Sequence, residues 1–175
     1  MDLRIAGRTA LVIAASEGLG RAVAGALARE GVNLTIVARR EEVLEEAAAQ
    51  IREEAGVDIV AVPTDITTEE GRRLALEATP VVDILVSSIG GHPPGDFDRF
   101  TIEDWRHVVD AMMLTPIELM KATLDGMVER KRWLHHRAEP PDGRRRGQHH
   151  LLIGPQPGQA VACSSSPRET ASTRR

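Results

Sequence analysis

The chain has 175 residues, of which 27% are charged and 42% hydrophobic, and this composition suits a single soluble domain. No apolar run reaches the ~20 residues that a membrane span needs, so a transmembrane protein is excluded. Asp2 and Arg4 precede Gly7 without an apolar stretch, and we expect no secretory signal. Cys163 is the only cysteine, which excludes a disulfide framework and favours a cytoplasmic protein.

Charge divides the chain into two unequal parts. Residues 1–131 hold 14 Lys and Arg against 23 Asp and Glu, whereas residues 132–175 hold 8 Arg against 3 acids. The second part also contains five of the ten prolines and four of the six histidines. We therefore predict an ordered domain over residues 1–131. For residues 132–175 we predict a basic, irregular tail, because it cannot bury enough apolar surface to offset its chain entropy.

Strand and helix patterns alternate through the ordered part. Continuous apolar runs, typical of strands buried on both faces, predict four strands over residues 9–15, 33–38, 58–62 and 81–87. Strands that alternate with helices form a parallel sheet with helices on both faces. We therefore predict an α/β fold with a doubly wound parallel sheet of about four strands.

Helical spacing of apolar residues predicts the connecting helices. The first two cover residues 18–30 and 41–55, with Leu19, Ala22, Val23, Ala26 and Leu27 at helical spacing in the first. Thr67 opens a third helix, with Glu70 three residues on as a capping box, and Thr101 caps a long fourth helix. Pro116 lies inside this last helix, and it should kink the helix or divide it because proline lacks a backbone donor.

The turn Ser16-Glu17-Gly18-Leu19-Gly20 joins the first predicted strand to the first helix. Glycines let a pyrophosphate approach backbone N–H groups, and the helix N-terminus adds partial positive charge. The alternative is a tight turn that binds no ligand. Its position between a strand and a helix favours a nucleotide site.

Arg39 and Arg40 follow the second predicted strand. In dinucleotide folds an acid at this point accepts the ribose 2′-OH of NAD, whereas an arginine suits the 2′-phosphate of NADP. The last two residues of this strand are Val37 and Ala38, and neither is an acid, so we expect NADP(H) to be favoured over NAD(H). The alternative is a solvated arginine pair at a helix start, which is disfavoured because it opposes the helix dipole.

Four segments in order carry a family resemblance. They are the run 12–21 around the glycine turn, Asp65-Ile66 after the third strand, residues 83–91, and residues 101–105 at the start of the fourth helix. Over residues 1–130 the chain resembles the short-chain dehydrogenase/reductase family. The segments are similar to its TGxxxGxG motif, its adenine-contacting acid, its D-x-L-V-N-N-A-G motif and the start of its fourth helix.

The resemblance implies a Rossmann-like sheet that binds NAD(P) and transfers hydride between nicotinamide and a small-molecule carbonyl or hydroxyl compound. Together with the glycine turn and the arginine pair, it predicts ten cofactor-binding residues: Ser16, Gly18, Leu19, Gly20, Arg39, Arg40, Asp65, Ile66, Ser88 and Gly90.

Several residues depart from the family pattern. Ile13 and Ala14 replace its first Thr-Gly, and Ser87 and Ser88 replace its paired asparagines. Met112 replaces an asparagine that holds a proton-relay water in the family, and a thioether anchors a water poorly. These changes indicate a divergent member with a weakened proton relay.

The family's catalytic residues cannot be placed. They are a substrate-orienting serine, a proton-transferring tyrosine and a lysine four residues after that tyrosine. The chain has no tyrosine and its last lysine is Lys131, so the Tyr-x-x-x-Lys pair is absent. Ser164, Ser165 and Ser166 match the serine by residue type alone and are given no role. We predict no catalytic residue and an impaired chain.

The family's strand order would place the four strands as 3-2-1-4 and leave the fourth at an edge. The long helix would then lose its usual neighbour and expose Met112, Leu119, Met120 and Met127, so we expect a homo-oligomer formed through residues 101–130. The change in composition after Lys131 is typical of a shifted reading frame, and the rival explanation is a genuine short variant. The alternative functions are a non-catalytic nucleotide-binding or dimerisation protein and a non-functional truncated product.

Other residue groups carry no predicted site. His135-His136 and His149-His150 lack the spacing of metal ligands, and we expect no metal. The arginines of 137–146 lack interleaved aromatic residues and a recognition fold, and we expect no nucleic-acid partner. We interpret His92 as an exposed loop residue.

Overall fold

The computed structural model describes residues 3–89, 96–130, 151–153 and 161–163. Its main sheet is parallel and has four strands in the order β3-β2-β1-β4, which confirms the predicted fold class and strand order. The strand β2 (Asn33–Ala38) has the predicted bounds, β1 (Thr9–Ile13) and β4 (Ile84–Val86) are shorter than predicted, and β3 (Ile59–Pro63) is shifted by one residue.

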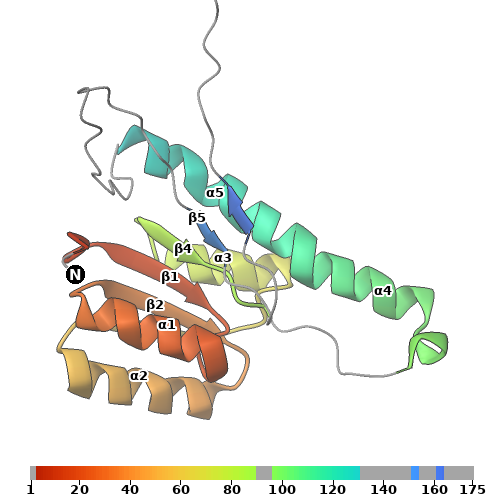
Figure 1. Ribbon diagram of the computed structural model, residues 1–175, viewed down its shortest axis with the longest axis horizontal. Coiled ribbons are helices and arrows are strands. Elements are labelled where there is room, and N and C mark those ends of the chain that lie inside the picture. The colour runs from red at the N-terminus through yellow and green to blue at the C-terminus, as the bar shows by residue number, and fades with distance from the viewer. Residues whose placement is uncertain (1–2, 90–95, 131–150, 154–160, 164–175) are drawn as a thin grey trace, which may run out of the picture.

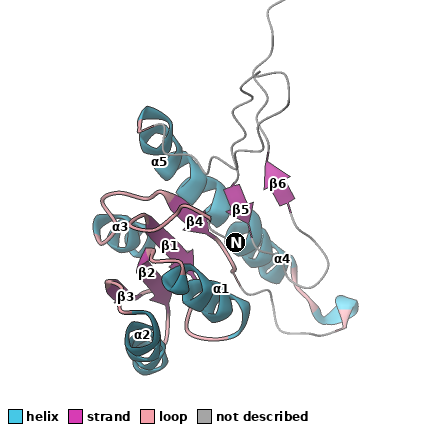
Figure 2. Cartoon of the chain, turned by 60° about the vertical axis from the view of Figure 1, so that its left-hand side comes forward, coloured by secondary structure: helices cyan, strands magenta, loops and turns pink. Residues whose placement is uncertain are grey.

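Helices cover both faces of this sheet. Figures 1 and 2 show α1 (Gly18–Arg29) and α2 (Glu41–Ala55) on one side, with α3 (Glu69–Glu77) and α5 (Thr115–Glu129) on the other. Because successive residues of a strand face opposite sides, β1 contributes to two separate cores. Val12 packs in the core beneath α1 and α2, and Leu11 packs in the core beneath α3 and α5.

The long predicted helix consists of three consecutive segments. α4 (Ile102–Val109) is followed by a π-helical turn, η2 (Asp110–Leu114), and then by α5, whose second residue is Pro116. The hydroxyl of Thr115 donates to the carbonyl of Asp110 at 2.9 Å. The proline therefore interrupts the α-helical hydrogen-bonding pattern as predicted, although α4 and α5 continue in nearly the same direction in Figure 1.

The predicted exposure of this helix is partly wrong. Met112 is exposed, but Leu119 and Met127 are buried in the core beneath α3 and α5. They are buried because α5 packs against the sheet, where they share a core with Leu11 and Leu85. A different row of apolar side chains is exposed along the helix, and we call it the apolar stripe: Val109, Met113, Ile117, Leu124 and Val128.

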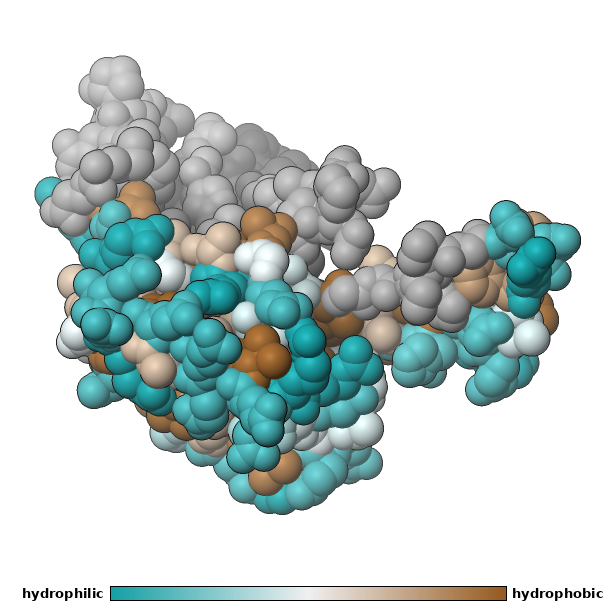
Figure 3. Space-filling view, turned by 90° about the horizontal axis from the view of Figure 1, so that it is seen from below, coloured by the Kyte–Doolittle hydropathy of each residue, from teal (hydrophilic) through white to brown (hydrophobic). Residues whose placement is uncertain are grey.

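The far end of α4 stands clear of the rest of the molecule. The space-filling view shows it as an arm that projects beyond the sheet and its helices (Figure 3). A short 3-10 turn, η1 (Phe97–Arg99), precedes α4 there. The rings of Phe97 and Phe100 lie 5.9 and 6.1 Å from the ring of Trp105, which gives the arm an aromatic end.

The structure tests the two predicted helix starts. Thr101 caps α4 as the sequence predicts, and the structure adds Asp104 as its reciprocal partner in a capping box. The prediction for Thr67 is wrong, because Thr68 is the cap of α3 and accepts from the backbone N–H of Gly71 at 3.0 Å. The Thr67 hydroxyl donates instead to Asp65 at 2.7 Å.

The described residues of the tail form two short strands. β5 (Leu151–Ile153) and β6 (Val161–Cys163) consist of apolar residues and pair antiparallel in a second small sheet. β5 lies beside β4 (Figure 1). Within the described residues, no helix combines the length and apolar character needed to cross a bilayer.

Candidate functional site

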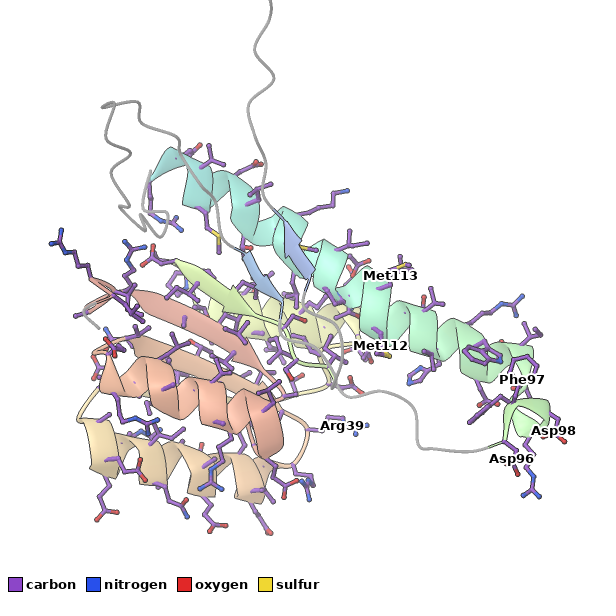
Figure 4. All side chains as sticks on the ribbon, viewed as in Figure 1. Arg39, Asp96, Phe97, Asp98, Met112 and Met113 are labelled. Atoms are coloured by element: carbon purple, nitrogen blue, oxygen red, sulfur yellow. The ribbon has the colours of Figure 1, made fainter. Side chains whose placement is uncertain are left out.

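A cavity of about 800 Å³ opens at the carboxyl ends of β1, β2 and β3, and α4 with η2 forms its opposite wall. The chain runs from β1 outward to β2 and β3 and then crosses back to β4 on the other side of β1, so the direction reverses at β1. Open α/β sheets bind ligands at the carboxyl ends of the strands beside such a switch point. Figure 4 shows Arg39 and Met112 on facing sides of the opening, one from the sheet edge and one from the helix.

The structure brings half of the predicted cofactor-binding residues together at this cavity. Five of the ten predicted residues line the cavity: Ser16, Arg39, Arg40, Asp65 and Ile66. The backbone turn Gly18-Leu19-Gly20 begins α1 next to Ser16 without lining the cavity. Ser88 follows β4 and is not in the lining, although its neighbour Ile89 is, and Gly90 lies outside the described residues.

Both glycines of the turn are needed by its geometry. Gly18 has φ of +59°, a left-handed conformation that favours glycine. A Cβ on Gly20 would lie 2.2 Å from the carbonyl oxygen of Ala14, so only glycine lets α1 approach the end of β1 this closely. The α1 cap, Glu17, makes no side-chain capping hydrogen bond, so it leaves the first-turn N–H groups uncapped.

Ala14 occupies the position where the family motif has its first glycine. Its φ is +57°, which L-residues adopt at a cost of about 1–2 kcal/mol. The next residue, Ala15, donates its N–H to the carbonyl of Val37 at 3.2 Å and so ties the turn to β2. The turn therefore keeps the family's backbone path without the family's glycine.

Arg39 and Arg40, which the sequence treats as one pair, have different partners. Arg40 forms an ion pair with Glu17, the cap of α1. Arg39 makes no hydrogen bond or ion pair with any residue that the structure describes. Its exposed guanidinium at the end of β2 is available to an anion in the cavity.

Asp65 is held by a turn that the sequence did not reveal. The hydroxyl and the backbone N–H of Thr67 donate to its Oδ1 at 2.7 and 3.0 Å, and no described residue donates to Oδ2. Burial raises the pKa of Asp65, but the Thr67 hydrogen bonds and the charges of Arg39 and His107 outweigh it, so its pKa lies below the usual value. Asp65 is therefore an ionised acceptor with one oxygen free.

Arg72 on α3 binds the backbone of the loop that follows Asp65. Its NH1 donates to the carbonyls of Ile66 and Thr67 at 3.2 and 2.7 Å, and its Nε pairs with Glu118 of α5 at 2.7 Å. Arg72 thus connects the cavity wall to two helices.

The cavity wall formed by α4 and η2 was not predicted from the sequence. It consists of His107, Val108, Ala111 and Met112, and of these only Met112 was singled out as a departure from the family pattern. These positions recur at intervals of one, three and one residues, which places them on one face of a helix. That periodicity was visible in the sequence, but nothing in it indicated which face met the sheet.

A buried serine, Ser87, follows β4 at a position where the family motif has asparagine. The Ser87 hydroxyl has no hydrogen-bond partner among the described residues. In the described part of the chain, no group of three His, Cys, Asp or Glu residues is placed to hold a metal.

Together the strand order, the glycine turn and the polar residues at the switch point define a dinucleotide-binding α/β protein. Residues 8–132 match the family described as short chain dehydrogenase. The chain belongs to this family of oxidoreductases, which act on small-molecule carbonyl and alcohol substrates.

Curated relatives show the extent of the similarity. The chain is 31% identical over 132 residues to the uncharacterized oxidoreductase YvaG of Bacillus subtilis (strain 168), covering 75% of this chain and 50% of that protein. It is 30% identical over 128 residues to a 7beta-hydroxysteroid dehydrogenase of Clostridium sardiniense, covering 72% and 49%. The chain therefore spans about half the length of these relatives.

Solved structures support a cofactor site of the same kind. The L-sorbose reductase of Gluconobacter frateurii, complexed with NADPH and L-sorbose, matches with a TM-score of 0.71 and 30% identity over 74% of this chain and 51% of the reductase. The NADPH-dependent reductase YwfH matches with a TM-score of 0.66 and 25% identity, over 71% and 54% of the two chains. These likenesses support NAD(P) binding.

Proposed function

We propose that this chain binds the adenosine half of NADP(H) in the cavity at the ends of β1, β2 and β3, and that it prefers NADP(H) to NAD(H). The observation that carries the preference is the guanidinium of Arg39, which borders the cavity and forms no hydrogen bond or ion pair with any described residue. A guanidinium binds the 2′-phosphate through charge-assisted hydrogen bonds, and a 2′-OH offers it much less.

The remaining residues fit the rest of the adenosine half. The uncapped N–H groups that follow Glu17 would hold the pyrophosphate. The free Oδ2 of Asp65 would accept from the adenine amino group, and Val108 and Ala111 would provide an apolar wall for the ring. Ser88 and Gly90, at and beyond the end of β4, stay in the proposal as residues on the nicotinamide side.

When bound, the nicotinamide supplies hydride to, or takes it from, the carbonyl or alcohol carbon of a small molecule. We propose that this polypeptide by itself does not complete that reaction, because its 175 residues contain no tyrosine to move the proton. Measuring NADPH oxidation with a panel of aldehydes and ketones tests the proposal. Any enzyme-dependent turnover contradicts it.

The proposal places cofactor binding in residues 1–131 and gives residues 132–175 no role. We place the protein in the cytoplasm, in keeping with its single cysteine. A second candidate function is self-association through the helix of residues 101–130. The apolar stripe favours it, because five neighbouring exposed apolar side chains on one helix are typical of an interface.

Isothermal titration with NADPH and NADH tests the preference. Wild-type protein should bind NADPH more tightly, and Arg39→Gln should weaken NADPH binding about 10- to 100-fold by removing charged hydrogen bonds, while leaving NADH binding nearly unchanged. Arg39→Asp should reverse the preference. Arg29→Gln removes a matched arginine at the other end of α1 and should change neither affinity.

Equal affinities for the two cofactors in wild-type protein would contradict the preference. If NADPH also gives no thermal shift and the near-UV circular dichroism lacks tertiary signal, the chain is a non-functional truncated product instead.

A further inference from the structure

The ion pair of Glu17 and Arg40 joins the two turns that border the cavity. Glu17 is the cap of α1 and Arg40 is the cap of α2, 23 residues further along the chain. They meet because β1 and β2 are parallel neighbours whose carboxyl ends lie side by side. Both side chains are about three-fifths exposed, so an anion from solvent can reach the pair.

This pair reduces the positive charge beside the cavity. Arg39 and Arg40 would together present two guanidinium groups to an anion, but the carboxylate of Glu17 neutralises one of them. The carboxylate of Glu17 also lies at the N-terminus of α1, where the helix dipole stabilises negative charge. A phosphate bound at this helix end would be stabilised in the same way. Glu17 therefore occupies, in part, the environment that suits a phosphate.

We propose that Glu17 is a specificity-determining residue that limits discrimination between NADP(H) and NAD(H) by pairing with the guanidinium of Arg40, which lines the cavity. This inference rests on the proposed function, because it concerns the same adenosine site. In the wild-type protein Arg39 alone meets the 2′-phosphate. Without the carboxylate of Glu17, Arg40 becomes a second donor to that phosphate and the electrostatic repulsion by the carboxylate disappears.

The expected change is moderate because the pair is exposed. Water and salt screen charges at this exposed site, so one added guanidinium donor to the 2′-phosphate should tighten binding by only about three- to tenfold. The direction makes the test robust, since loss of a carboxylate is expected to tighten binding, and a misfolded variant would weaken it.

Two adenosine fragments isolate the 2′-phosphate. The measured quantity is the ratio of the dissociation constant of 5′-AMP to that of 2′,5′-ADP, obtained by isothermal titration of the full chain at low salt. Glu17→Gln should raise this ratio about three- to tenfold, with the gain reduced at high salt. Glu54→Gln removes an exposed carboxylate that pairs with Arg29 away from the cavity, and it should leave the ratio unchanged.

A double variant tests the part of Arg40. Glu17→Gln combined with Arg40→Gln has the same net charge as wild-type protein and leaves Arg39 in place, so its ratio should return to within about twofold of wild type. A gain that survives in the double variant would overturn the role given to Arg40.

The outcomes separate this inference from the function on which it rests. If wild-type protein prefers 2′,5′-ADP but Glu17→Gln has the wild-type ratio, the inference is wrong and the proposed NADP(H) site stands. If no variant distinguishes the two fragments, both are wrong.

Discussion

The backbone of Ala14 is strained in the left-handed region, at a point where the related family motif has glycine. Ala14→Gly should therefore raise the free energy of unfolding by about 0.5–1 kcal/mol, because relief of the strain exceeds the added chain entropy of the unfolded state. Urea unfolding followed by circular dichroism measures the change.

The neighbouring residue provides the control. Ala15 is fully buried and has no positive φ, so Ala15→Gly should lower the free energy of unfolding by about 1 kcal/mol. If both variants are destabilised alike, the turn is not strained at Ala14.

The sequence predicted which residues lie at the site better than it predicted which residues they contact. The position of Arg39 and Arg40 after β2 indicated an anion site, and both line the cavity. Their different partners were not predictable, because the contact of Arg40 with Glu17 depends on two turns that meet only after β1 and β2 pair. The turn between Thr67 and Asp65 was likewise obscured by the capping box that Thr67 and Glu70 appeared to form.

Among the elements, α3 has the clearest role in shaping the site, through Arg72. Arg72→Met should lower the free energy of unfolding by about 1–3 kcal/mol, because two carbonyls and Glu118 lose their charged donor in a mostly buried setting. It should also weaken 5′-AMP binding by loosening the loop of Asp65.

The adjacent arginine is a matched control, since Arg73 is exposed and its ion pairs with described residues are with Glu70 and Glu77 of its own helix. Arg73→Met should cost no more than about 0.5 kcal/mol and leave binding unchanged. Chemical denaturation and titration of both variants measure the difference, and equal effects would show that Arg72 does not hold the cavity wall.

Element bounds followed from the sequence where propensity and packing agree. The predicted α2 is the observed α2, and its buried face includes Leu44, Ala47 and Ile51. For α1 the large apolar residue Leu19 is 49% exposed, while Gly20, Ala24 and Ala28 are buried. The reason is the close approach of α1 to β1, which admits only small residues, and helical periodicity alone does not show that distance.

Across the whole molecule, the apolar stripe predicts association between copies of the chain. Wild-type protein should show a mass that rises with concentration in sedimentation velocity experiments. Ile117→Glu should keep it monomeric, because burying a carboxylate at the interface is costly. Leu74→Glu changes an exposed leucine of α3 outside the stripe and should associate like wild type.

A wild-type protein that stays monomeric at every concentration would exclude the stripe as an interface for self-association. The arm that carries the exposed side chain of Phe97 is a separate apolar surface, and it would then be a candidate interface (Figure 4).

The global architecture was the part best predicted from sequence. Four alternations of strand and helix, with crossover handedness fixed, leave few topologies, and the order β3-β2-β1-β4 is the expected one. The short strands β5 and β6 were not predicted, because three-residue apolar clusters between prolines and arginines carry almost no periodicity.

The most direct test of the cofactor proposal is a crystal structure of the full chain grown with NADPH. We expect the adenosine half in the cavity, with the 2′-phosphate within hydrogen-bond distance of the Arg39 guanidinium and the pyrophosphate on the first turn of α1. NADPH bound elsewhere, or a cavity that stays empty at saturating NADPH, would contradict the account.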